Sequence, residues 1–134
     1  MSGRHLKVQF RIALLGGVII TSATAVSAQQ AGIGGFWSGG GTMTLRSGNA
    51  ENVRCRATFT PVGNGATMTA ICANATARVT QTADLTRVSA SRYVGDFVNA
   101  EFGISGSIRI TLSGNSLNAA LSGGGGSASL NLNR

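Results

Sequence analysis

The sequence has 134 residues and a formal net charge of +7, which is enough chain for one small domain. Its only histidine is His5 and its only lysine is Lys7, and both precede an apolar run near the N-terminus. If that N-terminal segment is a removable signal, the rest of the chain has no histidine-dependent triad, no histidine metal site and no lysine nucleophile.

The first residues have the layout of a secretory signal peptide. Residues 1–11 are polar and basic, residues 12–20 are apolar, and small residues follow with cleavage sites after Ala25 or Ala28. The apolar run is too short to span a membrane. We therefore expect residues 1–28 to be a signal peptide and 29–134 to be a single domain that is periplasmic or secreted. That domain has eight arginines and four acidic residues.

After the signal, short runs of alternating apolar and polar residues are separated by turn residues at intervals of about ten, which predicts an all-β domain. The first hairpin turns near Gly48. A three-residue loop at 48–50 sets Leu45 opposite Val53 and Met43 opposite Cys55, which keeps the apolar residues on one face.

The second hairpin has Gly63 and Asn64 as a two-residue loop, because glycine accepts the positive φ that a type II′ turn needs at its first position. This register places Cys55 directly opposite Cys72, in a non-hydrogen-bonded pair. Cα atoms in such pairs are about 4.5 Å apart, within reach of a disulfide. An even cysteine count in an exported chain also favours the bridge. Two thiolates without histidine do not complete a zinc site, so we expect no metal and no cofactor.

The C-terminal part repeats this pattern with a loop at 114–115, and a further hairpin passes through the glycines at 123–126. The middle is less regular, and residues 73–79, 84–89 and 91–98 can each be a strand. The whole gives about eight antiparallel strands in meander order. We expect a small barrel, with a two-sheet sandwich as the alternative.

The residues do not indicate catalysis. Nothing in their spacing brings two of the four carboxylates together, and there is no Gly-x-Ser-x-Gly nucleophile motif. We expect a non-enzymatic protein. The chain lacks the aromatic ladder of nucleic-acid binders and the aromatic girdles of membrane barrels, so neither nucleic acid nor a membrane-spanning position is expected.

Two kinds of residue are candidates for binding. Arg54, Arg56 and Arg109 project from the predicted polar faces, where they form an anion-binding surface or serve as ordinary solubilising charge. The partner of such a surface would be an anionic lipid, a glycan or an acidic protein. Trp37 follows a glycine-containing segment and either stacks on a ligand at a barrel mouth or closes the end of the core.

Several short motifs resemble a group of small exported alphaproteobacterial proteins without assigned activity. They are Trp37 before a glycine-rich turn, Arg54-Cys55-Arg56, a second cysteine seventeen positions later, and the run from Gly103 to Ile108. The resemblance implies an exported β-rich domain and no catalytic site. The segment from Ser89 to Tyr93 is also similar to a loop of periplasmic inhibitors of C-type lysozyme, which are small disulfide-bonded β-barrels. The positive charge of this chain opposes docking on a basic lysozyme.

These observations leave three functions open. The first is an interaction module of the cell envelope with an arginine-bearing surface, the second is a carrier of a small apolar ligand inside the barrel, and the third is an inhibitor of an envelope hydrolase. An interior filled by large apolar side chains favours the first. An interior of small residues leaves a cavity and favours the second.

Overall fold

The computed structural model describes residues 16–19 and 32–134. The predicted signal peptide and both cleavage sites lie outside these residues, apart from 16–19, which form neither helix nor strand. Where the chain is described, it forms no helix with the length and apolar character needed to cross a membrane.

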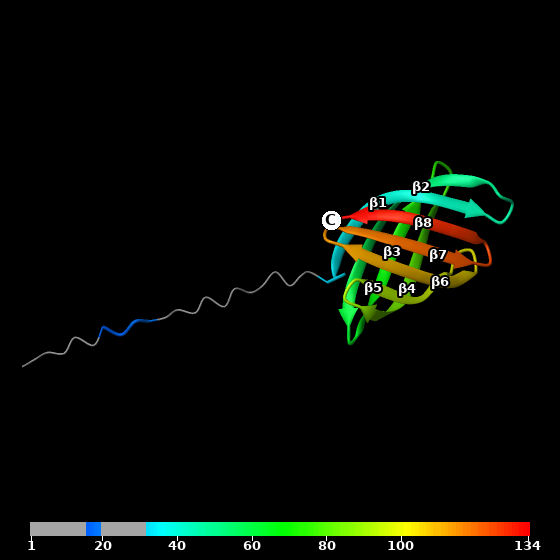
Figure 1. The fold of residues 1–134 in the computed structure, drawn as a ribbon. Helices are drawn as coiled ribbons and strands as arrows, with labels where there is room; N and C mark the ends of the chain where they lie inside the picture. The colour runs from blue at the N-terminus through cyan, green and yellow to red at the C-terminus, as the bar shows by residue number, and fades with distance from the viewer. Residues whose placement is uncertain (1–15, 20–31) are drawn as a thin grey trace, which may run out of the picture. The chain divides into compact units, whose positions relative to one another are not determined.

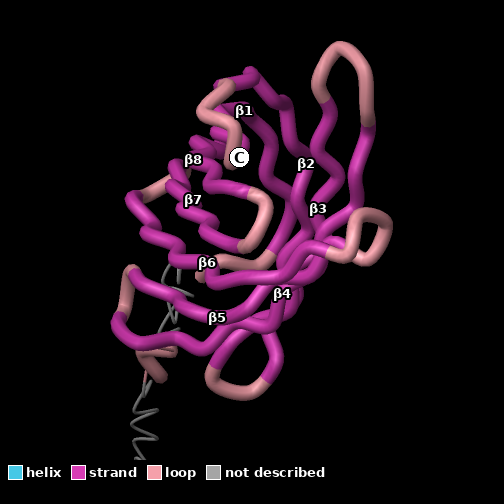
Figure 2. Tube along the Cα trace, turned by 90° about the vertical axis from the view of Figure 1, so that its right-hand side faces the viewer, coloured by secondary structure: helices cyan, strands magenta, loops and turns pink. Residues whose placement is uncertain are grey.

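Eight antiparallel strands close into a barrel in which each strand pairs with the next and β1 also pairs with β8 (Figure 1). The strands are β1 (Gly35–Leu45), β2 (Ala50–Val62), β3 (Gly65–Ala73), β4 (Arg78–Ser89), β5 (Arg92–Asn99), β6 (Ile104–Ser113), β7 (Ser116–Gly123) and β8 (Gly126–Asn133). Figure 2 shows that short turns join them. The predicted all-β meander barrel is confirmed, and the sandwich alternative is not adopted.

The hairpins with two-residue turns have the predicted register. Cys55 lies opposite Cys72, and Gly63 has a φ of 54°, as a glycine in the first turn position requires. In the C-terminal half, β6 turns into β7 at Gly114 and Asn115, and β7 pairs with β8 across the glycines that follow. Local turn chemistry therefore sets the pairing of five of the eight strands.

The predicted register of the first hairpin is wrong. Met43 pairs with Glu51 instead of Cys55, and the loop spans 46–48, since Leu45 N donates to Asn49 O at 2.8 Å. A three-residue loop of this kind needs a left-handed residue at its last position, and Gly48 fills it with a φ of 93°. The shift along β2 is four residues, an even number, so every side chain keeps its predicted face.

The middle of the chain also differs from the prediction. Residues 74–77 form a turn in which Asn74 Oδ1 accepts hydrogen bonds from the backbone nitrogens of Thr76 and Ala77, at 2.9 and 2.8 Å. The predicted strand over 73–79 is therefore interrupted. Residues 78–89 instead form one long strand, β4, with an irregular register at its end between Arg87 and Ser89.

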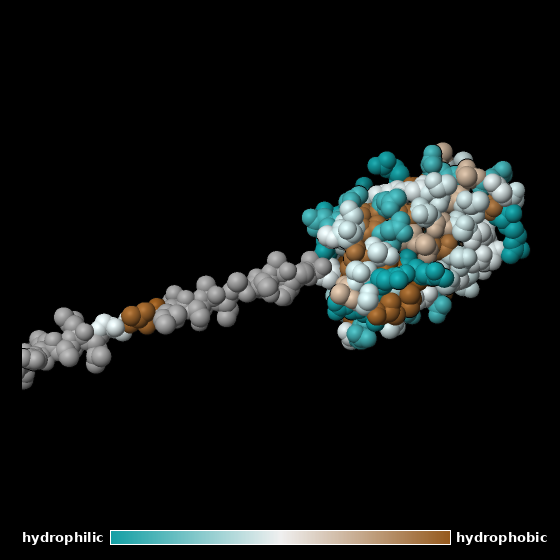
Figure 3. All heavy atoms as spheres, viewed as in Figure 1, coloured by the Kyte–Doolittle hydropathy of each residue, from teal (hydrophilic) through white to brown (hydrophobic). Residues whose placement is uncertain are grey.

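One end of the barrel interior is filled by large side chains. The most deeply buried are Ile33, Trp37, Phe59, Ile108, Ile110 and Leu117. The segment before β1 folds over this end, where Trp37 Nε1 donates to Ile33 O at 2.8 Å. The face drawn in Figure 3 has hydrophilic and neutral residues with apolar residues among them. The exposed large apolar side chains include Phe36 and Val62. We call the end of the barrel that contains Trp37 and Ile33 the closed end.

Several glycines lie where a neighbouring backbone comes close to the strand. A Cβ atom on Gly39 would lie 2.0 Å from Asn131 O, one on Gly41 1.9 Å from Ser129 O, and one on Gly95 1.8 Å from Asp84 O. Glycine is the residue that permits such an approach at the bends of a barrel. The high glycine content therefore belongs to barrel closure as well as to turns.

We expect the substitution Gly41→Ala to weaken the seam between β1 and β8, because the new methyl group collides with backbone that cannot rotate away. The loss of unfolding free energy should be about 1–3 kcal/mol, measured by denaturant unfolding. Gly124→Ala is the matched control, since the nearest heavy atom to its Cβ is 3.9 Å away on Arg46. Equal stability of the two variants would contradict the close approach of the strands.

The disulfide between Cys55 and Cys72 is present, with Cα atoms 4.1 Å apart. Reducing it should lower the melting temperature by on the order of 10 °C, because a loop of this size contributes about 3 kcal/mol to stability. Calorimetry with and without reductant measures the change. The double variant Cys55→Ala, Cys72→Ala should melt at the lower temperature with and without reductant. If the reduced wild type melts at the same temperature as the oxidised protein, the bridge does not contribute to thermal stability.

Candidate ligand-binding cavity

The end of the barrel opposite Trp37 is hollow. A cavity of about 260 Å³ opens there among the turns that connect β1 to β2, β3 to β4, β5 to β6 and β7 to β8. Leu45, Ala77, Phe102 and Gly125 lie at this open end and line the cavity. The meander topology itself produces this arrangement, because alternate turns fall at the same end of the barrel.

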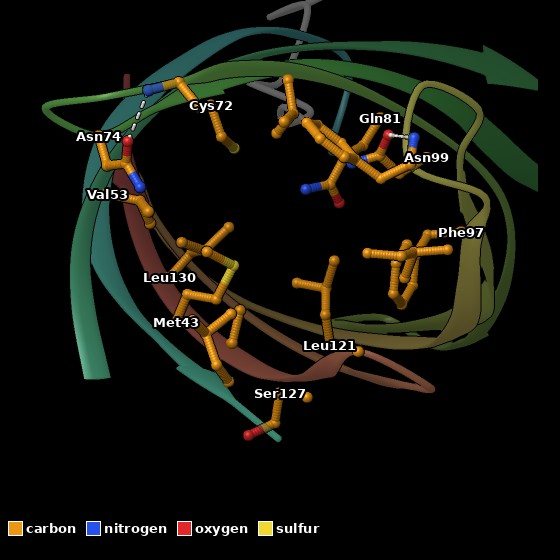
Figure 4. Close-up of a pocket in the computed structure, with 18 of the residues that line it drawn as sticks. Met43, Val53, Cys72, Asn74, Gln81, Phe97, Asn99, Leu121, Ser127 and Leu130 are labelled. Carbon is orange, nitrogen blue, oxygen red and sulfur yellow. Dashed lines mark hydrogen bonds between the residues drawn. The ribbon is translucent and has the colours of Figure 1, made fainter. Parts of the chain in front are cut away.

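The cavity wall is apolar. Its main apolar residues are Met43, Val53, Cys72, Val79, Phe97, Ile104, Leu121, Ala128 and Leu130. They come from all eight strands, because alternate residues of each strand point inward. Figure 4 shows Met43, Leu121 and Leu130 on one side of the hollow and Gln81 and Asn99 across from them.

The hollow results from side-chain size. At the closed end Trp37, Phe59 and Tyr93 fill the interior. At the open end two inward positions of β8 hold small residues, Gly126 and Ala128. A side chain at Gly126 is excluded, because its Cβ would lie 2.0 Å from Thr44 O. Gly126 therefore allows the close approach of β1 and β8 and also leaves its part of the cavity wall without a side chain.

Four polar residues line the cavity: Asn74, Gln81, Asn99 and Ser127. The amide of Asn74 is fully engaged, because its Nδ2 donates to Glu51 Oε2 at 2.7 Å and its Oδ1 accepts from the turn backbone. Asn99 is 5% exposed, and its Oδ1 accepts a hydrogen bond from Phe102 N at 3.3 Å. Gln81, on the adjacent strand β4, is half-buried. It lies beside Asn99, since Thr82 pairs with Val98 and the two amides are the next residues along the two strands. Of the residues described, none with a charged side chain lines the cavity.

Trp37, the candidate for ligand stacking, lies at the closed end and is 1% exposed. The guanidinium carbon of Arg134 is 4.2 Å from the centre of its ring, a cation–π contact. Arg134 Nη1 also donates to the carbonyl oxygens of Gly32 and Gly34, at 2.9 and 3.1 Å. Trp37 therefore packs into the core at the closed end, and Arg134 covers its ring.

The three candidate arginines do not share one surface. Arg54 and Arg56 lie on the outer face of β2, and Arg109 lies on the outer face of β6. In an eight-stranded barrel with this order, β2 and β6 are on opposite sides. The structure brings Arg56 instead beside Phe36, Ile71 and Arg134, which together with Trp37 line a second pocket.

The structure brings together two carboxylates that the sequence spacing did not associate. Asp84 on β4 lies directly opposite Asp96 on β5, and both are exposed on the outer face. No group of three or more potential metal-ligating side chains forms within the described part of the chain. The acidic pair lies outside the barrel and does not contribute to the cavity.

Sequence reasoning missed Gln81 and Asn99. Gln81 falls between two of the predicted strands, and Asn99 lies one residue beyond the predicted strand 91–98. Asn99 does continue the alternation of Tyr93, Gly95 and Phe97 on the inward face. An inward-facing asparagine at the end of an apolar alternation was therefore a visible signal, but its depth in a cavity depends on how the barrel closes.

No family model matches this chain, and no curated protein matches it. Two solved structures, both redesigned β barrels, are similar to it. One is entitled "b11L5F_LGL", has a TM-score of 0.61 and 16% identity, and is matched over 75% of this chain and 90% of its own. The other is "mFAP1, bound to DFHBI", with a TM-score of 0.63, 16% identity, and coverage of 75% and 94%. At this identity the similarity shows the barrel fold alone.

The burial of Trp37 gives a direct optical prediction, because it is the only tryptophan in the chain. Its fluorescence should be blue-shifted and almost insensitive to iodide in the native protein. The same protein unfolded in guanidinium chloride, at matched ionic strength, serves as the fully accessible reference. Native quenching as strong as that reference would show that the closed end is open in solution.

Proposed function

We propose that the mature chain is a non-enzymatic, exported binding protein that carries a small, mainly apolar ligand in the open end of its barrel. The observation that carries this proposal is the preformed apolar cavity of about 260 Å³. An interior filled along its whole length would have favoured a protein that acts only through its outer surface.

The size and chemistry of the cavity suit a small ligand. Ligand pockets are mostly apolar, largely preformed and about 300–1,000 Å³ in volume, so this cavity lies near the lower limit. Cavities of about 150 Å³ lined by aliphatic and aromatic side chains bind benzene. A compound with one or two rings, or a short branched chain, is therefore the class of ligand we expect.

Two further observations support parts of the proposal. One of the similar barrels is entitled as bound to DFHBI, so a small barrel of this fold can hold a small molecule. The disulfide between Cys55 and Cys72 is consistent with an oxidising compartment, which agrees with the signal peptide expected from the sequence. The disulfide and the expected signal peptide together support a proposed location in the periplasm or outside the cell.

The other two functions have weaker support. An anionic partner would meet Arg54 and Arg56 on β2, but Arg109 lies on the far side of the barrel. For an inhibitor of an envelope hydrolase, the Ser89–Tyr93 segment would have to present its tyrosine to the enzyme. Tyr93 instead faces the core and is 6% exposed.

Filling the cavity should abolish ligand binding. Ala128 lines the cavity, so Ala128→Phe places an aromatic ring in the space that a ligand needs. Titration with the neutral fluorescent probe N-phenyl-1-naphthylamine should give saturable binding to the wild type and at least tenfold weaker binding to this variant. The matched control is Ala120→Phe, which adds the same ring to an exposed position on the outside of β7.

The outcomes separate the cavity from the outer surface. Binding lost in Ala128→Phe and retained in Ala120→Phe supports the proposal. Probe binding that survives in Ala128→Phe, or is lost equally in both folded variants, places the apolar site elsewhere. A wild type that binds no probe rejects the carrier function.

A further inference from the structure

The buried amide of Asn99 is oriented by a backbone hydrogen bond. Its Oδ1 accepts from Phe102 N, at 3.3 Å, in the turn that follows β5. Only the oxygen of an amide can accept this bond, so the hydrogen-bond pattern determines which atom is Oδ1 and which is Nδ2. The amide group therefore cannot flip without losing its backbone partner.

This orientation leaves a hydrogen-bond donor without a partner. Within the described chain, no acceptor forms a hydrogen bond with Asn99 Nδ2, although the residue is 5% exposed and lines the cavity. Buried polar groups in folded proteins are almost always hydrogen-bonded, and an unpaired one marks a place where a ligand or an ordered water completes the pattern.

Gln81 supplies a second amide near Asn99. It lines the cavity beside Asn99 on the adjacent strand, and its side chain has no hydrogen-bond partner among the described residues. Figure 4 shows Gln81 and Asn99 on the same side of the hollow, while the third labelled amide, Asn74, lies on another side near Val53. We call the side with Gln81 and Asn99 the polar side of the cavity.

The polar side carries no charge to balance an ion. Two arginines lie in or next to the turns of the open end: Arg46 directly follows β1, and Arg78 is the first residue of β4. Both are exposed, and neither lines the cavity. Burying an ionised group without a counter-charge is strongly unfavourable. A neutral acceptor such as a carbonyl or hydroxyl oxygen meets no such penalty.

From these contacts we infer that the cavity selects neutral ligands that combine an apolar body with one oxygen acceptor, which binds Asn99 Nδ2. This inference rests on the proposed function and deepens it by naming the ligand class. Ketones, esters and alcohols with small apolar bodies belong to this class. Hydrocarbons and carboxylates of the same size do not.

Three matched compounds test the selection: 2-acetylnaphthalene as the ketone, 2-ethylnaphthalene as the hydrocarbon and 2-naphthoate as the carboxylate. The ketone preference is the ratio of the hydrocarbon Kd to the ketone Kd. Asn99→Leu should lower this preference about tenfold, the effect of one lost hydrogen bond, while hydrocarbon affinity stays unchanged or rises. The wild type should bind the carboxylate at least tenfold more weakly than the ketone.

Asn52→Leu is the control, because it makes the same chemical change at an exposed position on β2. It should leave the ketone preference unaltered. If Asn99→Leu loses hydrocarbon binding as well, the turn at 100–103 has been disturbed. In that case the variant Asn99→Asp, measured at pH 9, tests the role of the donor. One of its carboxylate oxygens still accepts from Phe102 N, while its second oxygen replaces the Nδ2 donor with an acceptor. Asn99→Asp should lose at least as much ketone preference as is expected for Asn99→Leu.

Each result has one meaning. A ketone preference that is the same in wild type, Asn99→Leu and Asn99→Asp overturns the role of Asn99 and leaves the carrier function standing. A carboxylate that binds the wild type as tightly as the ketone overturns the selection for neutral ligands. A wild type that binds none of the three compounds contradicts the proposed function itself.

Discussion

The structure depends on how closely neighbouring backbones approach one another in a narrow, strongly bent sheet. Where β1 meets β8, the carbonyl oxygens of Ser129 and Asn131 lie within about 2 Å of where a Cβ atom on Gly41 or Gly39 would be. Eight strands enclose only a small interior, so closure and interior volume are linked. Glycine at these contacts allows closure and, at Gly126, also leaves the cavity wall without a side chain.

The interior is divided into a filled half and a hollow half. Trp37 and Phe59 each remove a large apolar surface from water at the closed end, and burial of such side chains contributes about 1.5–3 kcal/mol each. The disulfide between β2 and β3 adds a covalent constraint. With stability supplied there, the open end can keep a cavity and a buried amide with an unpaired donor, both of which cost stability.

Local chemistry made much of this fold predictable. The period-two alternation predicts which side chains of each strand face the interior, and the Gly63-Asn64 turn predicts the pairing of Cys55 with Cys72. The first hairpin was misplaced because a three-residue loop needs its glycine last, not first. β4 was fragmented because its inward positions include Gln81 and its outward positions are rich in threonine, so the alternation is weak. The cavity was not predictable in the same way, since its volume and the burial of Asn99 depend on strands distant in sequence.

The alternation of inward and outward residues separates the two faces of every strand. On β8, Ala128 and Leu130 border the cavity, while Ser129 and Asn131 between them face outward. Substitutions at the inward-facing positions can therefore change the ligand, while substitutions at the outward-facing positions between them change the interactions of the outer surface. A family built on this barrel would diversify its contents and its exterior as two nearly independent traits, constrained jointly only at the glycines where the backbones touch.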